Sequence, residues 1–183
     1  EFSSAIKLLN ECLEYPHNLG EGKLSGAQEN DFHYWLGCAY EGLEQMDEAR
    51  KHWELAKEGN TEPAAAIFYN DQKPDKIFYQ GLALLKLGLP NEARIRFEKL
   101  VGFGKKHLDD IIKLDYFAVS LPDLLIWEDD LTFRNKIHCH YMLGLGYIGL
   151  GELATAKKHL LEAAKMDVNH QGVQVHLARI LNL

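Results

Sequence analysis

Apolar side chains recur at helical spacing along most of the chain, and one arrangement of them occurs three times. In the first unit Leu36, Tyr40 and Leu43 lie three or four residues apart, so they share one face of a helix. A second apolar set follows after a turn in each unit. The spacing predicts pairs of helices over about residues 30–63, 74–107 and 137–170.

The three units share small and large residues at fixed positions. Each has glycine at its eighth position, inside a helix, where glycine costs about 1 kcal/mol relative to alanine. Gly37, Gly81 and Gly144 therefore predict sites where another helix approaches too closely for a side chain. The remaining shared positions hold Leu36, Tyr40, Ala49, Trp53 and Ala56 in the first unit, Ala93 and Phe97 in the second, and Leu143, Tyr147, Ala156, Leu160 and Ala163 in the third.

These positions resemble the W-x2-L-G-x2-Y, A, F signature of the tetratricopeptide repeat (TPR), which is about 34 residues long. The resemblance implies an all-α fold, a TPR-like α-solenoid in which helix-turn-helix repeats form a right-handed superhelix with inserted loops. We expect about seven main helices and no sheet. The units start 44 and 63 residues apart, so about 10 and 29 residues are inserted between them.

The spacing of apolar residues at both ends of the chain indicates parts of further repeats. Residues 2–16 have the spacing of a second repeat helix, with Ala5, Leu9 and Cys12 on one face. Residues 171–183 predict a terminal helix, which either covers the last repeat or opens a truncated one. Its apolar face is expected to hold Val175, Leu177, Ala178 and Leu181. We interpret residues 1–183 as one TPR-like domain and as a fragment of a larger protein.

Two features mark the connections between helices. Gly88 and Gly151 predict left-handed ends for two first helices, whereas Glu44 stands at the matching position of the first unit, where we expect a different turn. The insertion at residues 109–136 contains an apolar run, residues 116–127. It either packs across the repeats or binds a partner, and we favour packing. Asp130 is the expected cap of the helix that follows.

Composition limits the classes of partner. Of 183 residues, 46% are hydrophobic and 26% charged, and the net charge is −7, which argues against nucleic acid as a partner. No apolar stretch reaches the length of about 18 residues that a membrane helix needs. Cys12, Cys38 and Cys139 are expected to be buried, reduced thiols of a cytoplasmic protein.

Candidate chemistry is sparse. His138 and His140 are two residues apart and so point about 200° apart on a helix, which prevents them from sharing one ion. No zinc-type spacing is present. His52 and His159 share one repeat position and are expected to be exposed. The glycine-rich residues 17–26 do not fit a phosphate-binding loop. The sequence therefore predicts no metal, no cofactor and no enzyme activity.

The resemblance also implies a groove lined by set positions of each first helix. Carried over, they are Asp31, Tyr34, Cys38, Glu41 and Gly42, then Asp75, Phe78, Leu82, Leu85 and Lys86, then His138, Tyr141, Leu145, Ile148 and Gly149. Some relatives clamp chaperone tails with lysine and asparagine there. With acids at Asp31 and Asp75, and only Lys86, this chain is not expected to do so.

The aromatic row Tyr34, Phe78 and Tyr141 leaves two interpretations open. It holds an apolar peptide or helix or stacks on a sugar, or it is core covered by the chain's own insertions. The main functional hypothesis is a TPR-type scaffold that binds a protein or peptide partner, or another domain of the parent chain, in this groove.

Residues 15–24 and 115–123 carry a second resemblance. They are similar to the carboxy-terminal repeat region of long, uncharacterised bacterial proteins that have a carbohydrate-associated, β-rich region. This resemblance implies an alternative function. The chain would then be an accessory domain of a carbohydrate-processing protein, packing on a catalytic region or contacting glycan.

Overall fold

The computed structural model describes residues 1–20, 22–23, 27–65, 72–112 and 130–181. Within these residues the chain forms eight α-helices and one short 3-10 helix, without a strand, which confirms the all-α prediction with one helix more than expected. The elements are α1 (Phe2–Cys12), η1 (His17–Leu19), α2 (Asn30–Gly42), α3 (Met46–Lys57), α4 (Pro74–Lys86), α5 (Pro90–His107), α6 (Leu131–Gly149), α7 (Leu153–Met166) and α8 (Gln171–Leu181).

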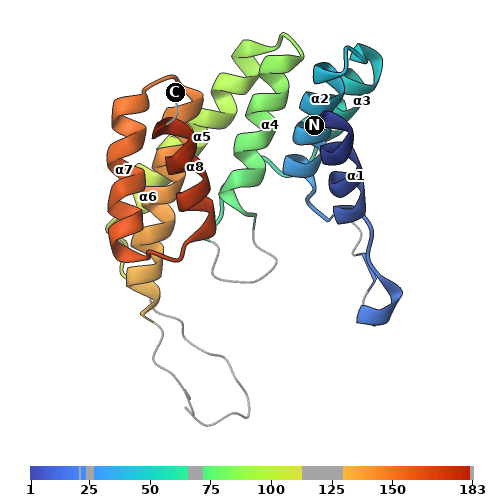
Figure 1. Cartoon of the computed structure of the whole chain (residues 1–183). Helices are drawn as coiled ribbons and strands as arrows, with labels where there is room; N and C mark the ends of the chain where they lie inside the picture. The colour runs from blue at the N-terminus through green and yellow to red at the C-terminus, as the bar shows by residue number, and fades with distance from the viewer. Residues whose placement is uncertain (21, 24–26, 66–71, 113–129, 182–183) are drawn as a thin grey trace.

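The helices pack as consecutive pairs, α2 with α3, α4 with α5 and α6 with α7. Figure 1 shows the pairs standing in a row, with α8 in front of α6 and between α7 and α4. One continuous apolar core runs through all three pairs, from Trp53 in α3 to Leu177 in α8. This is the TPR-like helical solenoid that the repeated pattern predicts.

The three signature glycines lie where a large side chain of the second helix packs on the backbone of the first. A Cβ atom at each would fall 2.3–2.4 Å from that side chain, which is far inside van der Waals contact. The predicted close approach is therefore confirmed, and the approaching group is a ring or a leucine. The pairs are Gly37 with Trp53, Gly81 with Phe97, and Gly144 with Leu160.

Replacing Gly144 with leucine is expected to lower the free energy of unfolding by about 1–3 kcal/mol, because the new side chain displaces Leu160. Urea denaturation followed by circular dichroism measures the loss. Gly102→Leu is the matched control, since Gly102 also lies in a helix but has open space around its Cα. Equal stability of the two variants would contradict the close-packing argument.

The turns inside the three pairs have the same geometry. Gly88 and Gly151 end the first helices with φ of 79° and 80°, as predicted, and Glu44 adopts φ of 61° at the matching position. In each turn the next amide donates to a carbonyl five residues back, for example Gln45 N to Tyr40 O at 3.0 Å. The expectation of a different first turn was wrong, because the helix-ending hydrogen bond imposes the left-handed conformation on glutamate.

Substituting Glu44 with glycine is expected to raise the free energy of unfolding by about 1 kcal/mol, because a residue with a Cβ is strained at this φ. Gly88→Ala should lower it by a similar amount. Thermal and urea unfolding of both variants provide the measurement. A less stable Glu44→Gly variant would show that the side chain of Glu44, rather than its backbone, determines stability here.

Two predictions concern the insertion at residues 109–136, and the structure tests only one of them. Asp130 caps α6, and its Oδ1 accepts a hydrogen bond from Phe133 N at 2.9 Å, as predicted. The apolar run at residues 116–127 lies outside the described residues. Its packing against the repeats therefore stays a prediction.

The terminal helix presents a different face from the one predicted. Val173, His176 and Leu177 of α8 are buried, whereas Val175 and Leu181 are 45% and 57% exposed. The prediction was wrong for Val175, Ala178 and Leu181, all of which are exposed. A polar residue, His176, stands in the middle of the buried face among aromatic rings, so the apolar pattern alone did not reveal that face.

The three cysteines differ in burial, and all are free thiols. Cys139 is buried and Cys38 is half-buried, but Cys12 is exposed at the end of α1. The predicted burial was wrong for Cys12, because α1 has no fully buried residue and its extensive packing is on α2.

Candidate functional site

The predicted groove residues fall into a buried tier and an accessible tier. The aromatic row is buried, since Tyr34, Phe78 and Tyr141 are 8%, 2% and 4% exposed and belong to the main core. Leu145 is buried beside it. Of the two interpretations of this row, the structure favours core, and a sugar cannot stack on Phe78 or Tyr141 while they are covered.

Helix α8 provides much of that cover. The ring of His176 lies edge-on to Phe78, with centroids 5.2 Å apart, and 6.0 Å from Tyr141. At the start of α8, a Cβ on Gly172 would lie 2.4 Å from the Tyr141 hydroxyl. The cover expected from the inserted segments is thus supplied, within the described residues, by the terminal helix.

The same helix reaches the first repeat. The guanidinium of Arg179 lies 4.5 Å from the centroid of the Trp35 ring in α2, which is a cation–π contact. Trp35 packs in turn against Tyr34 and Tyr79. Through His176 and Arg179, α8 therefore contacts α6, α4 and α2, and so all three first helices.

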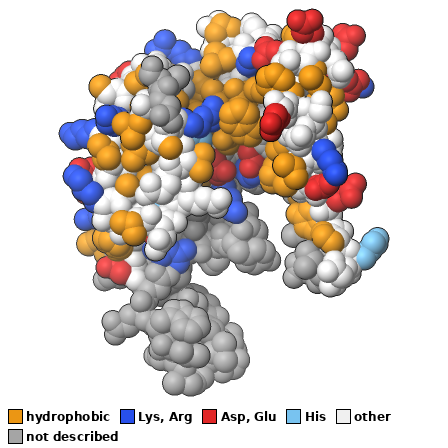
Figure 2. Space-filling view, viewed as in Figure 1, with side chains coloured by type: hydrophobic (Ala, Val, Ile, Leu, Met, Phe, Trp, Pro, Cys, Tyr) orange, Lys and Arg blue, Asp and Glu red, His pale blue; other side chains and the backbone are white. Residues whose placement is uncertain are grey.

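The accessible tier lies toward the carboxyl ends of the first helices. Its members are half-buried or exposed, and Leu85 is 45% exposed. Figure 2 shows hydrophobic side chains gathered on this face over the upper part of α4. We name these residues the upper groove: Cys38, Glu41, Leu82, Leu85, Lys86 and Ile148.

Charges in the groove are paired across neighbouring repeats. Lys86 Nζ lies 2.5 Å from Glu41 Oε2, and Lys76 forms an ion pair with Asp31. Lys76 also lies over the ring of Phe32, 5.3 Å from its centroid. Both lysines therefore have carboxylate partners already.

Burial is the main cause of the pKa shifts in and around the buried tier. Desolvation raises the pKa of Tyr34, Tyr79 and Tyr141 above the usual range of a phenol, and it raises the pKa of the Asp75 carboxyl. For His176 burial lowers the pKa to about 4, with Arg179 as a smaller cause. His176 is therefore neutral at neutral pH when α8 is packed against the repeats.

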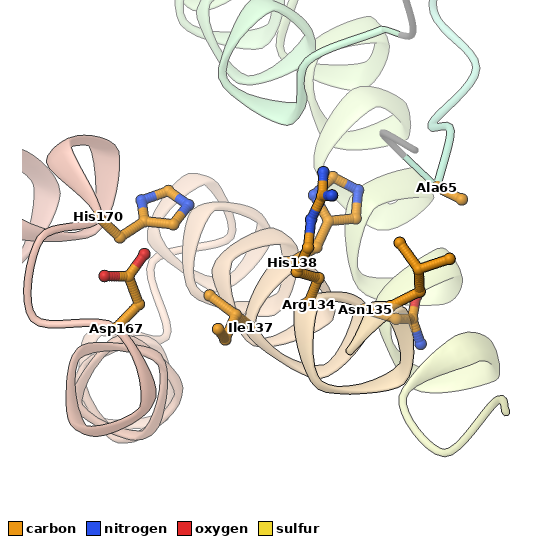
Figure 3. A pocket seen from close by; sticks show the side chains of 8 residues that line it. Ala65, Arg134, Asn135, Ile137, His138, Asp167 and His170 are labelled. Atoms are coloured by element: carbon orange, nitrogen blue, oxygen red, sulfur yellow. The ribbon is translucent and has the colours of Figure 1, made fainter. Parts of the chain in front are cut away.

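A cleft of about 250 Å³ lies beside the buried tier (Figure 3). His170, from the turn before α8, contacts Tyr141 with ring centroids 4.8 Å apart and links the cleft to the groove. In Figure 3 Asp167 and His170 stand on one side of the cleft, opposite Arg134 and His138. The lining residues are Ala65, Leu131, Arg134, Asn135, Ile137, His138, Asp167 and His170.

Hydrogen bonds position the polar side chains of this cleft. His138 Nε2 lies 2.8 Å from the carbonyl oxygen of Ala64, so this nitrogen is the donor. His170 Nδ1 accepts from the amide of Val173 at 3.2 Å, which leaves the proton of the neutral ring on Nε2. Asn135 donates to the carbonyl of His107 at 2.7 Å. Among the described residues that line the cleft there is no serine, threonine, cysteine or lysine.

Two histidine pairs link helices within the first and third units, and sequence reasoning missed them. His33 and His52 approach with Nδ1 atoms 3.1 Å apart, and His140 and His159 with Nδ1 atoms 3.0 Å apart. In each pair the second histidine also stacks on a tyrosine of the first helix. Histidine at the same two positions of both units was the sequence signal for these pairs.

Each pair must contain one donor and one acceptor nitrogen, so both rings cannot be protonated without opposing two N–H groups. Burial lowers the pKa of all four histidines, in agreement with neutral pairs. His52 and His159 are half-buried, so their predicted exposure was wrong. Within the described residues no group of three or more His, Cys, Asp or Glu side chains is placed to hold a metal ion.

Comparison with known families supports the repeat assignment. A family model of the tetratricopeptide repeat matches residues 31–58 and 137–170, which are in the first and third units. No solved structure matches the chain. Among the described residues no helix is both long enough and apolar enough to cross a membrane. The matches concern the repeats alone, so the resemblance to carbohydrate-associated bacterial proteins stays a hypothesis.

Proposed function

We propose that this TPR-like solenoid is a protein-interaction module that holds an apolar segment of a partner in its upper groove. Tetratricopeptide repeats generally mediate contacts between proteins, and solenoids of this kind use their concave surface for binding. The proposal assigns binding and no reaction to this segment. The partner is a protein or peptide, or another domain of the parent chain.

The observation that carries the proposal is the accessible apolar surface of the upper groove. Leu82 and Leu85 stand at predicted groove positions of α4. Leu82 is half-buried and Leu85 is exposed, while the aromatic row is covered. The Glu41–Lys86 ion pair lies across α2 and α4 in the same tier. An apolar strip beside paired charges fits the apolar face of a peptide or helix with polar flanks.

A peptide selection tests the proposal with a defined probe. Random peptides displayed on phage are selected on the immobilised full chain, and their affinities are measured by fluorescence anisotropy. We expect Leu85→Asp to weaken the selected peptides by about tenfold or more, equivalent to about 1.4 kcal/mol. Ile95→Asp is the matched control, because Ile95 is similarly exposed but lies on a second helix, α5.

Two results would count against the proposal. One is that the selected peptides bind Leu85→Asp as tightly as the wild type. The other is that Ile95→Asp loses binding to the same extent, which would place the peptides outside the groove.

A further inference from the structure

Helix α8 makes contacts beyond those that a terminal cap needs. A capping helix covers the last repeat, here α6 and α7, because each unit of a solenoid contacts its neighbours. α8 packs on α6 and α7 and also reaches Phe78 in α4 through His176 and Trp35 in α2 through Arg179. These additional contacts all lie on the groove side of the solenoid.

The inner face of α8 has the pattern of a helix bound in a groove. Val173, Leu177 and Ile180 follow one another at the spacing of a single helix face, and all three pack into the core clusters. A flat ring, His176, and a cation, Arg179, stand beside this row and meet aromatic rings. The opposite face, with Val175 and Leu181, is open to solvent.

We infer that α8 is an intramolecular ligand of the groove, and that the partner is an amphipathic helix which competes with α8 for the rings that α8 now contacts, Phe78, Tyr79 and Tyr141. This inference rests on the proposed function and goes beyond it, because the partner helix bound at the upper groove would also reach the rings below it and displace α8 from them. The competing helix carries aliphatic side chains at i, i+4 and i+7, a flat ring at i+3 and a basic residue at i+6, as α8 does.

The contact between Arg179 and Trp35, rather than the groove charges, favours a basic residue in the competing helix. Asp31, Glu41 and Asp75 are carried by the first helices, and Asp31 and Glu41 are neutralised by lysines of the next repeat. A basic side chain entering above Trp35 gains the ring contact that Arg179 now makes. A helix with an acidic residue at this position would lose that contact.

The test uses a labelled synthetic peptide of residues 169–181 and the full chain. In two variants only the chain's own α8 is damaged, while the added peptide keeps the native sequence. Gly172→Leu drives a side chain into Tyr141, and Arg179→Ala removes the contact with Trp35 without altering a buried residue. Val175→Ala, on the open face of the same helix, is the control.

We expect the peptide to bind both variants about tenfold tighter than the wild type or the control, because apparent affinity rises with the fraction of chains whose groove is open. Hydrogen exchange on the same proteins should show faster exchange in α8 of the two variants. Amides of α6 and α7 should keep their protection, which distinguishes undocking of α8 from unfolding of the last repeat.

Either of two outcomes overturns the inference. In the first, α8 exchanges faster in the variants but the peptide binds them no better than the wild type, so α8 and an added helix do not compete. In the second, α6 and α7 lose protection together with α8, so α8 is a structural cap only. Neither outcome affects peptides selected on the upper groove, whose dependence on Leu85 decides the proposed function separately.

Discussion

The Phe97→Ala variant is expected to lose about 3–5 kcal/mol of unfolding free energy, as other deletions of a buried phenylalanine ring do. Phe97 is 1% exposed and lies between the backbones of two first helices. A Cβ at Gly81 of α4 or at Gly149 of α6 would fall 2.3 Å or 2.2 Å from its ring. The ring also packs on Phe78, with centroids 5.9 Å apart.

The loss should be large because the space left by the ring cannot close easily. Glycine offers no side chain to fill it, and the walls are helix backbones held by their own hydrogen bonds. The packing of the aromatic row should also loosen, because Phe78 belongs to that row and contacts the Phe97 ring. Phe97→Leu should cost less, since the third unit carries Leu160 at the matching position.

Urea unfolding monitored by circular dichroism measures these differences. Ile95→Ala is the control, because Ile95 lies on the same helix and is 48% exposed, and it should change stability only slightly. A Phe97→Ala variant that loses no more than the control would show that the contact between the second and third repeats does not depend on this ring.

Acidification from pH 7 to pH 4 is expected to cost about 3 kcal/mol of stability through His176 alone. In the unfolded chain the pKa of this histidine is 6.5, whereas burial in the docked helix lowers it to about 4. Between these values the unfolded chain binds a proton that the folded chain does not. The contribution is therefore complete above pH 6.5 and is lost as the pH falls toward 4.

The surroundings of His176 set the direction of this change. It faces Tyr79 of α4, Tyr141 of α6 and, on its own helix, the cation of Arg179. Among the described residues no carboxylate contributes to the pKa of this ring. Burial also lowers the pKa of the four paired histidines, so their contribution to stability is lost on acidification too. Asp75 acts oppositely, because its raised pKa favours the folded state as the pH falls.

Comparing wild type with His176→Phe isolates the contribution of this residue, because the other titrating groups remain. The unfolding free energy of the wild type should fall more steeply from pH 7 to pH 4 than that of His176→Phe. The two curves should therefore converge or cross as the pH falls. His17→Phe, at an exposed histidine, is the control and should follow the wild type. Parallel curves for wild type and His176→Phe would contradict a docked, neutral His176.

The helical repeats could be predicted from the sequence because they depend on local spacing. Apolar residues three and four apart define a helix face whatever the rest of the chain does, and glycine inside a helix signals a close neighbour. The paired units, the contacts of Gly37, Gly81 and Gly144 and the cap at Asp130 follow from such local rules. Family matches to the first and third units agree with this pattern.

Features that depend on contacts between distant segments were decided by the tertiary structure alone. The buried face of α8 is determined by rings contributed by α4 and α6. The apolar pattern of α8 alone therefore predicted burial wrongly for Val175 and Leu181. The residues of the predicted groove lie on the first helices α2, α4 and α6. The cover over Phe78 and Tyr141 comes in part from α8, a helix that follows all three repeats. Glu44 takes a glycine-type conformation because the turn's hydrogen bond outweighs the preference of one residue. Local spacing determined the helices, whereas the energy of packing between distant segments determined which of their faces are free to bind.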